Sequence, residues 1–227
     1  MPGETSTSTA AGGAEPRPAA VTFVTTEHFT LQGARAATIA ESTGRATMFL
    51  GSVSAGLVAL GLIAAATRIG TTFYTFGVIV LSTLSFVGLV TFERVLQSGL
   101  EDHGYAERIA RLRAYYFDWA PEITGYLASV PPTQRLAIQG LRAGLWQGFR
   151  TIAGMVAVVT AVLTGSAAGL IAAVAAGHSG VAGFATGGVV TVAVLVALMR
   201  FQSSVWGQIS QHRFFDDQPA AAPPAGR

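Results

Sequence analysis

The densest group of titratable side chains in this sequence is the run Glu101-Asp102-His103. Carboxylates beside a histidine could supply metal ligands, acid–base groups or a pH-sensitive contact. Adjacent residues do not share one helix face, however. The run also falls where we expect a helix to begin, and acidic residues there favour the positive end of the helix dipole. We therefore interpret the run as helix capping, and we assign no catalytic, cofactor-binding or metal-binding residue.

Motifs of known enzymes are also missing from the sequence. It contains no phosphate-binding Gly loop with its Lys, no Gly-x-Ser-x-Gly and no His-Glu-x-x-His. The chain has no Cys, which excludes disulfides and thiolate metal sites. We therefore expect a non-enzymatic protein without a cofactor. An enzyme that uses Glu101, Asp102 and His103 at a membrane surface is the least favoured hypothesis.

Two other sets of side chains could contact ions or proteins. Hydroxyl groups near one helix face could line a pore in an oligomer, although Ser and Thr more often bond to their own helix or join helices: Thr71, Thr75, Ser82 and Ser85. Apolar and aromatic residues at a 4-3-4-3 spacing form a second face, which could bind a protein partner: Tyr105, Ile109, Leu112, Tyr116 and Trp119. The six acidic residues of this region and a net charge of only +2 oppose nucleic-acid binding.

The composition indicates where these side chains lie. The chain is 51% hydrophobic and only 11% charged, whereas about a quarter of a soluble domain is charged. Four stretches are long enough to cross a hydrocarbon core of about 30 Å, and they cover about 46–67, 70–92, 151–176 and 181–200. They are free of charge apart from Arg200 at the end of the last. These spans hold no other acid or base, which argues against a proton- or ion-coupled pump. The predicted fold is an all-α integral membrane helical bundle with four transmembrane helices.

Small residues recur at every fourth position in the last two spans. The first series is Ala153, Ala157, Ala161, Gly165, Gly169, Ala173 and Gly177, and the second is Gly183, Gly187 and Thr191. Such residues let two helix backbones approach closely in lipid. A four-residue step drifts around a helix of 3.6 residues per turn, so only three or four can share one face. We assign helix packing, within one chain or between chains, to Gly165, Gly169, Ala173, Gly183 and Gly187.

Helices are also expected outside the spans. Residues 1–24 and 218–227 are predicted to be disordered tails on either side of a four-span domain at 25–217. A helix at about 27–46 either packs on another copy or on the middle segment, or is a solvated extension of the first span.

The segment 93–150 is predicted to be helical, with one helix that Pro121 ends and another that begins at Thr133. Beyond Arg200, a helical spacing continues through Phe201, Val205, Ile209 and His212. Trp206 and Arg213 suit the membrane interface, so we expect the fourth helix to emerge from the membrane there.

The arginines predict the topology. One side of the membrane carries Arg68 alone, beside the turn at His178, and nearly all the other arginines lie on the opposite side. By the positive-inside rule, both termini and residues 93–150 are cytoplasmic, and the protein lies in the inner (plasma) membrane. Residues 27–46, 101–150 and 201–215 would then form a small cytoplasmic helical layer.

The segments 27–32, 40–46 and 108–116 suggest a relationship. They resemble segments of small multi-span proteins from GC-rich bacteria, a group without an established activity. The three segments are Glu27-His28-Phe29-Thr30-Leu31-Gln32, Ala40 through Ala46, and Arg108-Ile109-Ala110-Arg111-Leu112-Arg113-Ala114-Tyr115-Tyr116. This resemblance covers roughly residues 27–205. More loosely, a helix that leads into a two-span hairpin and a cytoplasmic helix resembles SLATT-type membrane effectors of nucleotide-signalled defence, which usually carry two spans.

We therefore expect a self-associating multi-pass membrane protein, a pore-forming or effector subunit, whose partners are the lipid bilayer and other copies of itself. The alternative hypothesis is a membrane scaffold or regulatory subunit that binds a cytoplasmic protein through residues 93–150.

Overall fold

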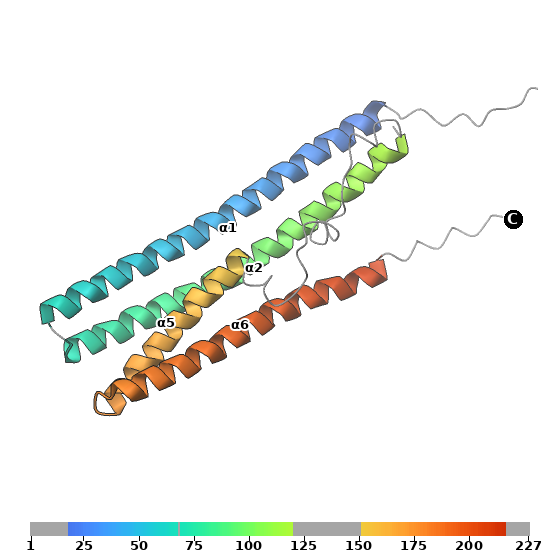
Figure 1. Ribbon diagram of the computed structural model, residues 1–227. Helices are drawn as coiled ribbons and strands as arrows, with labels where there is room; N and C mark the ends of the chain where they lie inside the picture. Colours follow the sequence, from blue (N-terminus) through green and yellow to red (C-terminus); the bar gives the residue numbers. More distant parts are fainter. Residues whose placement is uncertain (1–17, 68, 120–150, 217–227) are drawn as a thin grey trace, which may run out of the picture.

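The protein is seen in a computed structural model that describes residues 18–67, 69–119 and 151–216, with side chains over 21–67, 69–113 and 151–208. This part of the chain is 95% helical and contains no strand, which confirms the predicted all-α class (Figure 1). The helices are α1 (Pro18–Thr67), α2 (Thr71–Trp119), α5 (Ile152–Ala175) and α6 (Gly180–Asp216). All four are long and apolar enough to cross a membrane.

The helices pack in sequence order rather than around a common axis. α1 packs on α2, α2 on α5, and α5 on α6, whereas α1 and α5 have few contacts. The short connections 67–71 and 175–180 lie at one end, which we call the turn end, and α1, α2 and α6 run past α5 at the other, the polar end (Figure 1). α5 is consequently the most buried helix and α6 the least.

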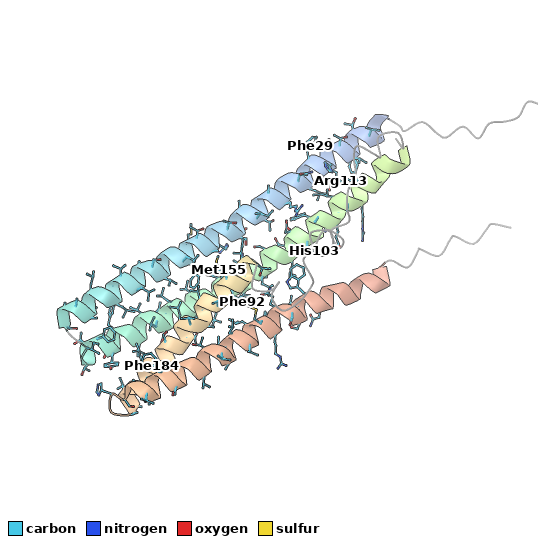
Figure 2. All side chains as sticks on the ribbon, in the orientation of Figure 1. Phe29, Phe92, His103, Arg113, Met155 and Phe184 are labelled. Atoms are coloured by element: carbon cyan, nitrogen blue, oxygen red, sulfur yellow. The ribbon has the colours of Figure 1, made fainter. Side chains whose placement is uncertain are left out.

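Charged residues begin at the same height on the three long helices. Counted from the turn end, the first charge comes 22 residues along α1 at Arg45, 22 along α2 at Glu93 and 20 along α6 at Arg200. At 1.5 Å per residue these lengths are about 30–33 Å, close to the thickness of a hydrocarbon core. We call residues 46–67, 71–92, 152–175 and 180–199 the apolar band. Its outer surface carries large apolar side chains such as Phe184, which is 87% exposed (Figure 2).

The core of the bundle lies where α1, α2 and α5 meet. Phe49 of α1, Phe92 of α2 and Val156 of α5 are among its most buried side chains. Gly88 allows this approach, because a Cβ there would lie 2.9 Å from the Phe49 ring and would also overlap the hydroxyl of Thr160. The apolar side chains of three helices thus interdigitate around one glycine.

The contact between α5 and α6 is made by glycine backbones. A Cβ added at Gly169 would lie 2.8 Å from the Gly183 carbonyl oxygen, and one at Gly187 would lie 2.9 Å from the Gly165 carbonyl oxygen. A Cβ at Gly183 would meet Ala173 at 3.0 Å. The five residues assigned to helix packing are therefore brought together within one chain. Ala153 and Ala157, earlier in the same series, belong instead to the core with Phe49 and Phe92, as the drift of a four-residue step requires.

A capped turn reverses the chain between α5 and α6. The Gly177 amide donates to the Val174 carbonyl at 3.2 Å and the His178 amide to the Ala173 carbonyl at 2.7 Å, a Schellman arrangement. Gly177 and His178 both have positive φ, 66° and 69°. The Ser179 hydroxyl then accepts from the Ala182 amide at the start of α6. His178 is a turn residue, as the sequence predicts, and its ring contacts Tyr74.

Two predicted helix boundaries are wrong. Glu101-Asp102-His103 lies in the middle of α2 rather than at a helix start, because no helix-breaking residue interrupts α2 before Pro121. α1 begins at Pro18, inside the predicted disordered tail, and is continuous with the predicted helix at 27–46. That helix is thus an extension of the first span, and it also packs on α2. The rest of the tails and the helix predicted from Thr133 lie outside the described residues.

The glycine contact predicts a contrast between two Gly→Ala variants. Gly169→Ala places a methyl group against a backbone carbonyl, and we expect a loss of about 1–3 kcal/mol in the free energy of unfolding. Gly188→Ala, in the same band but with open space around it, should be neutral or stabilising by up to about 1 kcal/mol. Thermal denaturation in detergent, followed by the soluble fraction on size exclusion, measures both. Equal stability of the two variants would contradict the contact.

Candidate functional site

All four helices contribute to a cavity at the polar end. Its volume is about 170 Å³. It lies just beyond the apolar band, near the first charged residues of α1, α2 and α6. Its lining is mostly apolar, with a few polar groups: Thr38, Ile39, Ser42, Val95, Leu96, Ser98, Gly99, Asp102, Thr151, Ile152, Ala153, Gln202 and Trp206.

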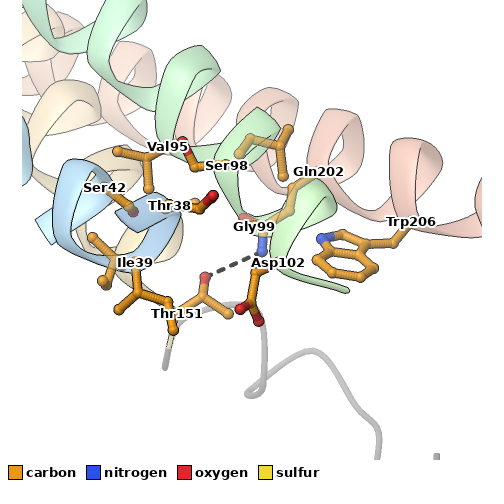
Figure 3. Close-up of a pocket in the computed structure, with 13 residues that line it drawn as sticks. Thr38, Ile39, Ser42, Val95, Ser98, Gly99, Asp102, Thr151, Gln202 and Trp206 are labelled. Carbon is orange, nitrogen blue, oxygen red and sulfur yellow. Dashed lines mark hydrogen bonds between the residues drawn. The ribbon is translucent and has the colours of Figure 1, made fainter. Parts of the chain in front are cut away.

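Gln202 is the most buried polar side chain of α6 in the described residues, with 5% exposure. It extends from α6 toward the start of α5, where its Nε2 donates to the Thr151 hydroxyl at 3.3 Å (Figure 3). Its Oε1 atom is buried and accepts no hydrogen bond within the described part of the chain. A buried amide oxygen without a donor is costly, about 1–3 kcal/mol. The cavity therefore contains an acceptor that a bound molecule can satisfy.

Three hydroxyl groups that line the cavity form hydrogen bonds with the backbone of their own helices. The Thr38 hydroxyl donates to the Ala34 carbonyl at 3.1 Å, and the Ser98 hydroxyl donates to the Arg94 carbonyl at 3.0 Å. Thr151 is the N-cap of α5, where its hydroxyl accepts from the Gly154 amide. Because the hydroxyl hydrogens of Thr38 and Ser98 are already donated, these two groups can only accept further hydrogen bonds, through their lone pairs.

An ion pair joins α1 to α2 at the edge of this cavity. Arg35 donates through Nε to Asp102 Oδ1 at 2.7 Å and through a terminal nitrogen to Oδ2 at 3.3 Å. The hydrogen bond to Asp102 raises the pKa of Arg35 above its ordinary value, the attraction of the carboxylate adds to this, and partial burial opposes both. A raised base pKa contributes stability at every pH below the ordinary value, so titration of Arg35 gives no pH dependence near neutrality.

His103 does not act with its sequence neighbours. Its Nε2 lies 3.7 Å from Glu107 Oε1 one turn along α2, and its ring meets Trp206 of α6 at a centroid distance of 5.5 Å. Glu101 points outward and is exposed. The three members of the run Glu101-Asp102-His103 thus have three different surroundings, as expected of adjacent residues on a helix. No group of three His, Cys, Asp or Glu side chains with metal-binding geometry occurs in the described residues.

The four hydroxyl residues of the second span do not share one environment. Thr71, Thr75 and Ser82 are exposed, whereas Ser85 is buried and donates to the Leu81 carbonyl at 2.7 Å. The exposed outer face of α2 also carries Ile79 and Phe86, which are 60% and 67% exposed. Within one chain these hydroxyl groups do not line a common path.

The predicted partner face is partly used inside the chain. Ile109 is buried with 5% exposure, and Tyr105 and Leu112 are half-buried. The side chains of Tyr116 and Trp119 lie outside the described ones. Those three described residues therefore have less free surface than an open docking face would offer.

Gln202 was not predicted as a site residue. The helical spacing that begins at Phe201 is present in α6, but it does not identify the buried face, because Phe201 is 51% exposed while Gln202 is buried. The two directions differ by about 100° around the helix, and contacts with α5 decide between them. A polar residue one turn before Trp206, a residue already expected near the membrane interface, was the only available signal.

Comparison of the chain with known protein families, with curated proteins and with solved structures finds no match. A function must therefore be argued from the residues and their geometry.

The ion pair between α1 and α2 predicts a measurable coupling. In a double-mutant cycle of Arg35→Ala and Asp102→Ala, we expect a coupling of about 1 kcal/mol, the upper end for half-exposed pairs, because the guanidinium makes two hydrogen bonds. The local pair Arg45–Glu41 is the matched control and should give about 0.3–0.5 kcal/mol. Unfolding in SDS mixtures measures both couplings. A coupling for Arg35–Asp102 no larger than the control would show that the pair does not tie the two helices.

Proposed function

We propose that this protein is a non-enzymatic, multi-pass membrane protein that forms a homodimer through the outer face of α1, with both termini in the cytoplasm. The observation that carries the proposal is a row of mostly small residues on α1 that faces away from the other described helices.

The row lies opposite the buried face of α1. The buried face includes Ala46, Phe49, Val53 and Leu60. On the other side, a row of residues follows at alternating spacings of three and four: Gly44, Thr47, Gly51, Ser54, Val58, Gly61 and Ala65. Gly44 is half-buried and the other six are exposed. A Cβ added at Gly44, Gly51 or Gly61 would meet nothing within 4 Å. We call this row the small face of α1.

Contact with lipid alone does not favour such a face. A glycine inside a helix costs about 1 kcal/mol relative to alanine, and lipid chains do not need close access to the backbone. A second helix does, because association in lipid depends on close packing. Four glycines of α5 and α6 are already used in the contact between these two helices: Gly165, Gly169, Gly183 and Gly187. Gly77 and Gly88 of α2 face side chains of the same chain. Gly188 of α6 also has open space, but the open glycines of α1 lie in one row, which favours the small face of α1 for a contact between chains.

The position of α1 favours a closed pair. α1 lies at one edge of the row of helices, with α2 on its inner side only. Two copies related by a twofold axis can join through identical small faces, and such a contact closes on itself. A pore would need further faces, and the outer face of α2 carries Ile79 and Phe86 beside its hydroxyl groups. The geometry thus favours a dimer over a ring.

The charge distribution supports the proposed orientation. The described arginines, among them Arg35, Arg94 and Arg108, lie at the polar end. In the sequence, Arg68 follows directly on the last residue of α1, and it lies outside the described residues. The positive-inside rule then places the polar end in the cytoplasm.

The small face predicts a selective disulfide. The chain has no cysteine, so Ser54→Cys and Ser52→Cys each introduce a single thiol. Both serines are exposed and both bond back to their own helix, at 3.0 and 2.9 Å, but they point about 160° apart around the helix. We expect oxidation in membranes to cross-link Ser54→Cys into a dimer and to leave Ser52→Cys largely monomeric. Equal cross-linking of the two variants would contradict the proposed interface.

The orientation predicts which thiols are reached from outside the cell. Thr71, at the turn end, and Gln97, at the polar end, are both exposed. A membrane-impermeant maleimide added to intact cells should label Thr71→Cys and should label Gln97→Cys only after permeabilisation. The reverse pattern would show that the topology is inverted.

A further inference from the structure

The cavity at the polar end has a chemistry that points to a ligand, independently of the dimer. We propose that it binds the hydroxyl end of an uncharged amphipathic alcohol, whose hydroxyl group donates to Gln202 Oε1. The carbon chain of the alcohol would lie against the apolar lining.

The unsatisfied acceptor sets the first requirement. Gln202 is 5% exposed, its Nε2 is already bonded to Thr151, and its Oε1 has no donor among the described residues. The hydroxyl groups of Thr38 and Ser98 cannot supply one, because each donates to a carbonyl of its own helix. A ligand that carries a hydrogen-bond donor would satisfy this buried oxygen, which the described residues of the cavity leave without a donor.

Charge sets the second requirement. The cavity is lined by the first turn of α5, the positive end of a helix dipole, which disfavours a cation. It is also lined by the Gln202 oxygen and by the Asp102 carboxylate, which already has Arg35 as its partner, and these disfavour an anion. A hydroxyl group suits both, because it donates to an oxygen and accepts from an amide N–H.

Size and position set the third requirement. A volume of about 170 Å³ is roughly ten times what a single water needs, and it is smaller than a pocket for a drug-sized ligand. Ile39, Leu96, Ile152 and Trp206 give the cavity an apolar lining. It lies just outside the apolar band, at the height where the polar end of an amphiphile in a bilayer would lie. Such an alcohol can come from the bilayer, as a lipid with a free hydroxyl, or from water.

A pair of probes isolates the hydroxyl group. Trp206 lines the cavity, and replacing Trp119 and Trp146 by Phe leaves it as the only tryptophan. Its quenching in nanodiscs is titrated with 8-bromo-1-octanol and with 1-bromooctane, which carries bromine but no hydroxyl. We expect saturable quenching by the alcohol alone. Gln202→Met, which keeps the volume and removes the acceptor, should weaken the alcohol's binding about three- to tenfold. Gln208→Met, the same change at an exposed position of α6, should leave it unchanged.

Two outcomes would overturn the proposal. Unsaturable and equal quenching by both probes would mean that the cavity holds water only. Saturable alcohol binding that is unchanged by Gln202→Met would place the alcohol elsewhere. If Gln202→Met gives no folded particle, the two probes still test the proposal on the protein with Gln202 in place. Only a site specific for the hydroxyl group would bind 8-bromo-1-octanol and not 1-bromooctane. Displacement of the bromoalcohol by dioctanoylglycerol identifies a lipid source, and displacement by 1-octanol alone identifies a water-borne one; either result supports the shared chemistry.

Discussion

The close backbone contact between α5 and α6 is the constraint on which the rest of this structure depends. Inside an apolar band, helices gain little from the hydrophobic effect, so packing must hold them together. Gly165, Gly169, Gly183 and Gly187 allow each backbone to lie on the carbonyl oxygens of the other. α6 is otherwise the least buried helix, and this contact gives it a defined position. It thereby brings Gln202 and Trp206 against the starts of α5 and the extensions of α1 and α2, where the cavity forms.

The same contact decides which glycines remain for other chains. Gly165, Gly169, Gly183 and Gly187 are used in the contact between α5 and α6, and the glycines of α2 in the apolar band receive side chains of the same chain. Gly51 and Gly61 of α1 have open space and lie in one row. A helix at the edge of a row, with small residues facing outward, is suited to meet its own copy. The long extension of α1 beyond the band is held by Arg35 and Asp102, so a dimer built on α1 would carry two paired helical arms at its polar end.

Much of the architecture could be predicted from the sequence, because charge-free stretches and periodic small residues are local signals. They predicted the four long apolar helices and the residues of the α5–α6 contact. Other features depend on long-range contacts. Arg35 and Asp102 are 67 positions apart, and no spacing rule connects them. The cavity was not predicted, because the orientation of α6 that buries Gln202 rather than Phe201 is set by its packing on α5. The run Glu101-Asp102-His103 was wrongly predicted to lie at a helix start. The sequence does not distinguish acidic residues in the first turn of a helix from acidic residues in the middle of a continuous helix.

The mass of the protein in lipid nanodiscs, measured by native mass spectrometry at several protein concentrations, tests the central claim most directly. If the small face of α1 joins two copies, the particle should contain twice the 23.4 kDa mass of the chain, and Gly51→Leu with Gly61→Leu should convert it to single chains without loss of folded protein, because both sites have open space in the monomer. A particle with the mass of one chain at every concentration would contradict the account.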